Sequence, residues 1–283
     1  MENNIENILK YGIDELNRLN IEDAKIKAQI LLMHIINKPK QYLIINKNEI
    51  LNEPLLKQYK QGIEKLKQNT PIQHITNTQE FMGLKFYVDE NVLIPRFDTE
   101  ILVEEIIEIN KNTQNLKVLD MCTGSGAIAI CLQKLLNNST VYAIDISQKA
   151  LDVAKKNNEA NKTKVNFIQS NMFENIGENE FDIIVSNPPY IETKTIKQLN
   201  EDVKKEPAIA LDGGADGLVF YKILAEQAHK FLKNNGILAM EIGYNQKESV
   251  EAILKETNHY KEIYCRKDLN GNDRLIVCRK KWC

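Results

Sequence analysis

Apolar residues in the first part of the chain recur every three or four positions, the spacing of a helix with one buried face. Three such series predict helices, over residues 5–19, 24–35 and 55–66. Asn52 followed by Pro54 is a typical start for the third helix, because Asn caps a first turn and Pro fits there without losing a hydrogen bond. We therefore predict a small helical domain over residues 1–70.

The pattern changes after residue 70. Residues 72–75 and 84–88 form two short apolar runs, punctuated by Gly83 and by the turn-forming stretch 89–91. Short runs separated by turn residues are typical of paired strands. We therefore predict a β-hairpin linker over residues 71–96.

From residue 97 onward, short apolar runs alternate with amphipathic helices. The predicted strands are 117–121, 141–145, 165–169, 181–186 and 236–242. The predicted helices are 126–137, 147–160, 217–233 and 246–257. This alternation is typical of a mostly parallel sheet that carries helices on both faces.

The end of the chain has a different pattern. Two apolar runs, 260–265 and 274–278, flank Asn270-Gly271, a dipeptide that favours a hairpin turn. The sequence thus predicts an α/β domain over residues 97–283, with a Rossmann-like, mostly parallel seven-stranded sheet that ends in an antiparallel hairpin. This outline is similar to that of class I S-adenosylmethionine methyltransferases, and a nucleotide-binding dehydrogenase is the alternative at this level.

Composition argues against several classes of protein. The chain has 283 residues, 43% hydrophobic and 27% charged, and a net charge of −2, unlike a protein held on nucleic acid by bulk electrostatics. We see neither an apolar run of about 18 residues nor a signal-peptide pattern, so we expect a cytoplasmic protein. The five cysteines form no CxxC pair and the four histidines no HExxH motif, so we expect no metal site and no disulfide framework.

A glycine-rich loop follows the first predicted strand of the sheet. Gly124, Gly126 and Ala129 fit the G-x-G-x-x-G/A pattern of nucleoside-binding loops. Asp145 ends the next strand, 19 residues after Gly126, where an acid can bind ribose hydroxyls. An ordinary strand–helix turn, with Asp145 as a helix cap, would give the same pattern.

Asp120, just before this loop, decides between two cofactors. The pyrophosphate of NAD would lie close to this carboxylate and be repelled by it. S-adenosylmethionine has no phosphate and carries an ammonium and a sulfonium, which a carboxylate attracts. We therefore expect Asp120 to help bind S-adenosylmethionine. Cys122, inside the loop, is expected to be a packed, inert thiol rather than a nucleophile.

The fourth predicted strand of the sheet runs into Asn187-Pro188-Pro189-Tyr190, at the edge where α/β folds bind ligands. An amide or aromatic amino nitrogen is a poor nucleophile because its lone pair is delocalised. The Asn187 side-chain oxygen and the Pro188 carbonyl can accept its two N–H bonds and aim the lone pair at a methyl donor. Both prolines stiffen the backbone, and Tyr190 is expected to form a flat wall for the acceptor. This points to methyl transfer to a glutamine amide or a nucleobase amine.

These motifs together resemble the HemK/PrmC family, the methyltransferases that modify the glutamine of the Gly-Gly-Gln motif in bacterial class I release factors. The resemblance extends over nearly the whole chain. It rests on residues 71–75, 80–83, 93–100, 187–190, 206–214 and 271–274. It implies a helical substrate-recognition domain, a hairpin linker and a methyltransferase domain. It also implies a release factor as the protein substrate, with no stable binding to nucleic acid or membrane, and we expect a monomer.

The resemblance also implies roles for single residues. It assigns cofactor contacts to Cys122, Thr123, Gly124, Ser125, Gly126, Asp145, Met172 and Asn187. Met172 would lie near the adenine, and Asn187 would bridge cofactor and substrate. The segment from Asn187 to Tyr190 would bind the glutamine, with Asn187, Pro188 and Tyr190 taking part in catalysis. Two departures from the family pattern are Cys122 in place of glycine and Asn171-Met172 in place of an acidic-aromatic pair.

Two further segments have more than one interpretation. Residues 95–100 either touch the methionine end of the cofactor or only start a helix, with Thr99 or Asp98 as its cap and Arg96 in a surface ion pair. Residues 206–217 contain Gly213, Gly214 and Gly217, so they can be mobile and close over the substrate. A plain connection between strand and helix is the alternative.

Three other functions remain open from the sequence. Glutamine methylation of a ribosomal protein would use the same catalytic segment. Adenine methylation of DNA needs a basic recognition domain, whereas residues 1–70 carry 11 Lys/Arg against 9 Asp/Glu. A cofactor-binding scaffold without turnover would show damage at Asp120 or in the segment 187–190, and both are intact.

Overall fold

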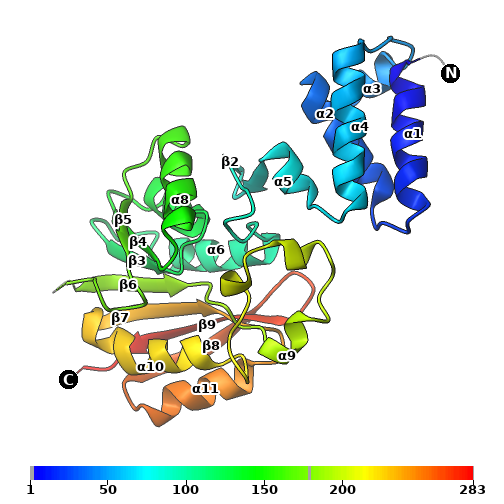
Figure 1. The fold of residues 1–283 in the computed structure, drawn as a ribbon. Helices are drawn as coiled ribbons and strands as arrows, with labels where there is room; N and C mark the ends of the chain where they lie inside the picture. The colour runs from blue at the N-terminus through cyan, green and yellow to red at the C-terminus, as the bar shows by residue number, and fades with distance from the viewer. Residues whose placement is uncertain (1–2, 178–179, 283) are drawn as a thin grey trace. The chain divides into compact units, whose positions relative to one another are not determined.

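The computed structural model describes residues 3–177 and 180–282. It divides into two compact units (Figure 1). The first contains the residues up to Thr78 together with Asn200–Lys205, and the second contains Gln79–Leu199 and the residues from Glu206 onward. No helix in the described ranges is long and apolar enough to cross a membrane.

The first unit is helical, as predicted. Its helices are α1 (Ile5–Asn17), α2 (Ala24–Ile36), α3 (Lys40–Ile45), α4 (Glu53–Lys67) and α5 (Ile72–Thr76). The start predicted for α4 is confirmed, because the Asn52 side chain accepts the N–H of Leu55 at 3.1 Å. The short helices α3 and α5 were not predicted.

The predicted linker is wrong in its first half. Residues 72–75 form α5 rather than a strand, because Ile72 and Ile75 lie three positions apart and both pack into the helical core. The hairpin is formed instead by β1 (Gln79–Phe81) and β2 (Leu84–Phe86). Phe81 and Phe86 are buried in the core of the second unit. The predicted linker is therefore divided between the two units rather than forming a part of its own.

A seven-stranded sheet forms the centre of the second unit, with strand order β5-β4-β3-β6-β7-β9-β8. The strands are β3 (Lys117–Met121), β4 (Thr140–Asp145), β5 (Asn166–Gln169), β6 (Phe181–Ser186), β7 (Leu232–Glu241), β8 (Tyr260–Lys267) and β9 (Asp273–Lys280). The first five strands in this order are parallel, and β9 is antiparallel to both β7 and β8. The predicted sheet and its terminal hairpin are confirmed.

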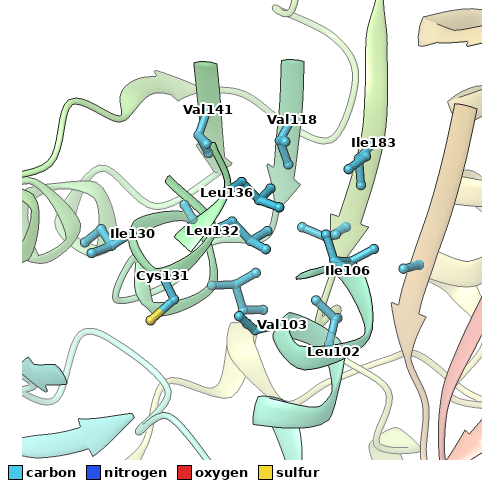
Figure 2. Close-up of a cluster of buried hydrophobic side chains, with 14 of the residues drawn as sticks. Leu102, Val103, Ile106, Val118, Ile130, Cys131, Leu132, Leu136, Val141 and Ile183 are labelled. Atoms are coloured by element: carbon cyan, nitrogen blue, oxygen red, sulfur yellow. The ribbon is translucent and has the colours of Figure 1, made fainter. Parts of the chain in front are cut away.

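Helices cover both faces of this sheet. One face carries α6 (Glu100–Ile109), α7 (Ala127–Leu135) and α8 (Gln148–Ala160), and the other carries α10 (Val219–Phe231) and α11 (Lys247–Glu256). Figure 2 shows side chains of α6 and α7 directed toward Val118, Val141 and Ile183 on the strands. The short helices α9 (Thr193–Ile196), η1 (Phe97–Thr99), η2 (Val203–Lys205) and η3 (Ala208–Ala210) lie in the connections.

The strand register brings four loop starts to one edge. Met121 pairs with Ile144 of β4 and with Ser186 of β6, and Ser186 pairs with Met240 of β7. Because these strands are parallel, the residues that follow them emerge together at the carboxyl edge of the sheet.

Close helix packing in the first unit gives a stability prediction. A Cβ atom on Gly12 of α1 would lie 2.1 Å from the hydroxyl oxygen of Tyr59, which is fully buried on α4. We expect Gly12→Ala to lower the free energy of unfolding by about 1–3 kcal/mol, because Tyr59 must leave its site. Urea unfolding followed by circular dichroism measures this. Lys10→Ala, at an exposed position on the same helix, is the control, and equal stability of the two variants would contradict the prediction.

Candidate active site

Two cavities lie at the carboxyl edge of the sheet, and both are lined by predicted site residues. The larger has a cavity volume of about 150 Å³ and opens to solvent. The predicted site residues that line it are Cys122, Gly124, Asp145, Met172, Asn187 and Pro189. The smaller has a cavity volume of about 50 Å³, and the predicted site residues that line it are Cys122, Thr123, Gly124, Ser125 and Asn187. Cys122, Gly124 and Asn187 line both, so the two cavities meet at these residues.

The two glycines of the loop have different reasons to be glycine. Both have positive φ, +54° at Gly124 and +81° at Gly126, where a side chain is strained. A Cβ on Gly124 would meet no atom within 4 Å, because this position faces the open cavity. A Cβ on Gly126 would lie 3.1 Å from the Cβ of Ala154 on α8. Gly124 therefore leaves room for a ligand, whereas Gly126 lets α8 pack closely.

Asp145 lies in the wall of the larger cavity, at the end of β4. Its Oδ2 accepts the N–H of Gly124 at 2.9 Å, and its Oδ1 accepts the N–H of Ser147 at 2.9 Å. Burial raises the pKa of Asp145, although these N–H donors oppose the shift. The cap of α8 is Ser147, which accepts the N–H of Ala150 at 3.2 Å. Asp145 is therefore not the helix cap, and it lines the cavity with lone pairs that these two N–H groups leave available.

Asp120 lies behind the loop rather than in a cavity wall. It is fully buried, and it lines neither of the two cavities. Its Oδ2 accepts the Thr123 hydroxyl at 2.6 Å and the N–H of Ala129 at 3.2 Å, while its Oδ1 has no hydrogen-bond partner among the described residues. Burial raises the pKa of Asp120 to about 7 against these donors. The expected direct contact with the cofactor is thus replaced by a supporting role, in which Asp120 holds Thr123 and the start of α7.

Cys122 and Met172 occupy positions where a glycine and an aromatic residue are common in the family. Both adopt left-handed backbone, with φ +62° and +47°, which is the conformation that glycine adopts without strain. Their sulfur atoms lie 3.9 Å apart in the wall of the larger cavity. Burial raises the pKa of the Cys122 thiol, which keeps it protonated. This agrees with the inert role expected for Cys122.

Asn187 follows β6 and lies where the two cavities meet. Its Nδ2 donates to the Thr99 hydroxyl oxygen at 3.2 Å. The side-chain carbonyl Oδ1 is therefore the end of the amide that remains available as an acceptor. Pro189 lines the larger cavity, while Pro188 is buried and lines neither cavity.

Tyr190 lies differently from the prediction. It lines neither cavity, and its hydroxyl donates to Oε1 of the buried Glu241 at 3.2 Å. Its backbone carbonyl oxygen accepts from Nε2 of Gln246 at 3.0 Å. Its placement therefore makes Tyr190 an anchor of the segment 187–190 and not a flat wall for the acceptor.

Glu241 and Gln246 are site residues that the sequence argument missed. Gln246 is almost fully buried and donates from Nε2 to Gly217 as well as to Tyr190, while its Oε1 accepts the N–H of Gly243 at 2.9 Å. A signal for Glu241 was present. Like Asp120 and Asp145, it is a single acid at the carboxyl end of an apolar strand.

The segments 95–100 and 206–217 meet beside the cavities. Arg96 lines the smaller cavity and pairs with Glu206, whose carboxylate is buried and also accepts the N–H of Ile94 at 2.8 Å. The ion pair predicted for Arg96 therefore involves a buried partner rather than a surface one. Thr99 is the residue before α6, but its side chain makes no cap hydrogen bond. Its hydroxyl accepts from Asn187 instead.

The glycines of the segment 206–217 serve packing. A Cβ on Gly213 would lie 2.7 Å from the Cα of Tyr190, and the Gly213 N–H donates to the Ile191 carbonyl at 2.8 Å. Pro207, Ile209 and Ala210 line the larger cavity. The segment is thus hydrogen-bonded to the chain that follows Tyr190, and close packing rather than mobility accounts for Gly213.

Comparison with known proteins agrees with this geometry. Residues 7–76 match the PrmC N-terminal domain, and residues 96–215 match the methyltransferase small domain. The release factor glutamine methyltransferase of Clostridium botulinum is 40% identical, over 98% of this chain and 99% of its own length. The chain belongs to the release factor glutamine methyltransferase family. The resemblance predicted from the motifs is confirmed.

Longer relatives carry additional sequence. The bifunctional methyltransferase of Rickettsia felis is 38% identical over 98% of this chain, but the chain spans only 58% of that relative. Among solved structures, a methyltransferase from Pyrococcus furiosus has a TM-score of 0.52 at 20% identity, covering 71% of this chain and 91% of that one. The ribosomal protein L11 methylase of Lactobacillus delbrueckii has a TM-score of 0.51 at 22% identity, covering 69% and 84%. Both confirm the class I methyltransferase fold.

The cavity residues fit S-adenosylmethionine, the cofactor of this fold class. Gly124 leaves open space for a nucleoside, Asp145 offers acceptors for ribose hydroxyls, and no lysine or arginine lines the larger cavity to bind a phosphate. The smaller cavity offers Arg96 and the hydroxyl-bearing residues Thr99, Thr123 and Ser125 to an amino-acid end.

The two loop glycines give a matched test of this fit. We expect Gly124→Ala to weaken S-adenosylmethionine binding about tenfold or more, because its Cβ enters the ligand space. Gly126→Ala carries similar backbone strain, about 1–2 kcal/mol, but its Cβ meets Ala154, so stability falls further. Isothermal titration calorimetry and thermal unfolding measure the two effects. Unchanged affinity in Gly124→Ala would place the cofactor elsewhere.

Proposed function

We propose that this chain transfers a methyl group from S-adenosylmethionine to the side-chain amide nitrogen of the glutamine in the Gly-Gly-Gln motif of class I peptide chain release factors. The observation that carries the proposal is the position of Asn187, with an available amide oxygen at the meeting point of two cavities. Relatives that this chain matches over most of their length are named release factor glutamine methyltransferase, which supports a glutamine of a release factor as the acceptor.

The hydrogen bond to Thr99 sets the orientation of the Asn187 side-chain amide. Since Nδ2 donates to the Thr99 hydroxyl oxygen, Oδ1 is the atom that can accept an N–H from a substrate amide. Pro188 as a residue is buried and lines neither cavity, but its carbonyl oxygen has no hydrogen-bond partner among the described residues, and this oxygen is the second acceptor in our proposal. Two acceptors on the two N–H bonds fix the plane of the acceptor amide. Its nitrogen lone pair, otherwise delocalised into the carbonyl, is then directed at the methyl donor.

Bound S-adenosylmethionine supplies an electrophilic methyl group on a positively charged sulfur. The residues around it contribute alignment, which in well-oriented reactions is worth about 7–11 kcal/mol. The amide N–H becomes acidic only as the new carbon–nitrogen bond forms, so its proton can pass to water and no strong base is required. The acceptors at Asn187 and Pro188 stabilise that N–H as its positive charge develops.

The remaining parts have expected roles in this proposal. The helical unit, matched by the PrmC N-terminal domain, would recognise the release factor, and the cavities would serve only the reacting groups. Tyr190 would act by anchoring the segment 187–190. We expect the enzyme to work as a monomer in the cytoplasm, where release factors act, without stable binding to nucleic acid or membrane.

Acceptor specificity is tested with a radiolabelled methyl donor and four acceptors. These are a class I release factor, the same factor with the Gly-Gly-Gln glutamine changed to alanine, ribosomal proteins, and duplex DNA. We expect label only in the intact release factor. Label in a ribosomal protein or in DNA, with none in the release factor, would reject the proposed acceptor.

Asn187→Ala tests the catalytic segment. We expect turnover to fall by about 100-fold or more, because one of two acceptors that orient the amide is lost, while part of the cofactor affinity remains. Steady-state kinetics and calorimetric binding of S-adenosylmethionine measure the two quantities. Asn112→Ala, at an exposed position that lines neither cavity, is the control. Full activity of Asn187→Ala would refute the role assigned to this side chain.

A further inference from the structure

Glu241 is a buried carboxylic acid directly behind the segment 187–190. It ends β7, next to the central strand β6, and only 2% of its surface is exposed. It lines neither of the two cavities. A carboxyl group in such a position costs free energy unless hydrogen bonds compensate for its lost hydration. Its partners therefore indicate why the chain carries an acid there.

Two hydroxyl groups face this carboxyl. Tyr190 donates to Oε1 at 3.2 Å. The Thr99 hydroxyl lies beside the same group and lowers its pKa, which favours the ionised form. Oε2 is buried and has no hydrogen-bond partner among the described residues. The backbone carbonyl of Glu241 is occupied separately, since it accepts the Tyr221 hydroxyl at 3.0 Å.

Thr99 connects this carboxyl to Asn187. Its oxygen accepts from Nδ2 of Asn187 at 3.2 Å, so its own proton must point elsewhere. An ionised Glu241, whose pKa the nearby Thr99 hydroxyl lowers, is an acceptor only and offers that proton a partner. A protonated Glu241 carries a proton of its own and can donate it to the Thr99 oxygen, which frees the Thr99 proton to turn toward Asn187, where it favours the amide oxygen over Nδ2. The protonation state at Glu241 thus decides whether the Asn187 amide keeps its orientation.

We propose that Glu241 is a positioning residue for methyl transfer, which through Thr99 and Tyr190 fixes the Asn187 amide with its oxygen toward the acceptor. The inference rests on the proposed function, because it concerns how the same segment is held. Glu241 itself touches neither substrate nor cofactor. As an acceptor, its carboxylate keeps the hydroxyls of Thr99 and Tyr190 directed toward itself. Each end of the segment 187–190 is therefore held.

Several charged groups surround Glu241. Arg274 on β9 favours the ionised form, and Asp98 on η1 opposes it. Arg274 is itself paired with Asp268 at 3.0 Å and with Asp98 at 3.3 Å, so its charge is largely shared. Tyr190 and Tyr221 also face the carboxyl, and burial raises the pKa of both phenols, which therefore stay neutral.

The expected pH dependence follows from burial. Burial raises the pKa of Glu241 to about 7, although Thr99, Arg274 and Tyr190 oppose the shift. Because the ionised form is the one that orients Asn187, turnover should rise as pH increases through about 7 and level off above it. Asp120 behind the glycine loop titrates in the same range, so the assignment needs a variant of Glu241 itself.

Glu241→Gln is the direct test. The variant keeps the shape, but its NH₂ group donates where the carboxylate accepted. We expect kcat with a release factor to fall about 100-fold, KM for S-adenosylmethionine to stay within about twofold, and the rise near pH 7 to disappear. The matched control is Glu105→Gln, which removes another buried carboxylate that accepts a tyrosine hydroxyl, from Tyr264 of β8 at 2.7 Å. It should keep the pH profile and most of the activity.

A second pair of variants covers the case in which Glu241→Gln fails to fold. Thr99→Val removes the hydroxyl between Glu241 and Asn187 at nearly the same shape, and Thr99→Ser keeps it. We expect loss of kcat in the first and recovery in the second. A rise near pH 7 that persists in Glu241→Gln, or equal activity of the two Thr99 variants, would overturn the inference. A wild-type enzyme that does not label the release factor would instead reject the proposed function.

Discussion

The free energy cost of burying a carboxylate determines how the active edge of the sheet is built. Asp120, Asp145 and Glu241 lie at the carboxyl ends of three parallel strands. Each accepts a hydrogen bond from a residue in a loop that follows one of the strands. Asp120 receives the Thr123 hydroxyl, Asp145 the N–H of Gly124, and Glu241 the Tyr190 hydroxyl. Since an unsatisfied buried carboxylate is costly, each loop has one favoured shape. The positions of the cofactor loop and of the segment 187–190 both depend on this constraint.

Most of the fold could be predicted because its elements are long and strongly patterned. The strands and helices from residue 117 to residue 278 appear where apolar runs and helical spacing place them, with shifts of a few residues at their ends. The failures lie in short segments. Residues 72–75 carry apolar residues three apart, which a single helical turn and a short strand can both bury, and only the surrounding core distinguishes the two.

The candidate site was predictable in its parts but not in its connections. Sequence patterns indicate that Gly124, Asp145 and Asn187 lie at the strand ends, and they line the cavities. Sequence does not show which donors converge on one acid. The sequence therefore predicts Asp120 as a direct ligand of the cofactor, although Thr123 and Ala129 donate to it behind the loop. It predicts Tyr190 as a wall for the acceptor, although the Tyr190 hydroxyl donates to Glu241. Thr99 lies 88 residues before Asn187, and local spacing cannot reveal their hydrogen bond.

The order of the strands has a consequence for how this chain is made. β9 is the last strand in sequence, yet it lies inside the sheet between β7 and β8. During synthesis on the ribosome, β7 therefore keeps an unpaired edge after most of the domain has emerged. Such edges invite wrong pairing with other chains. Arg274, which balances the charge beside Glu241, belongs to this same late strand. The nascent domain thus completes its sheet and the electrostatics of its catalytic edge together, when β9 pairs with β7.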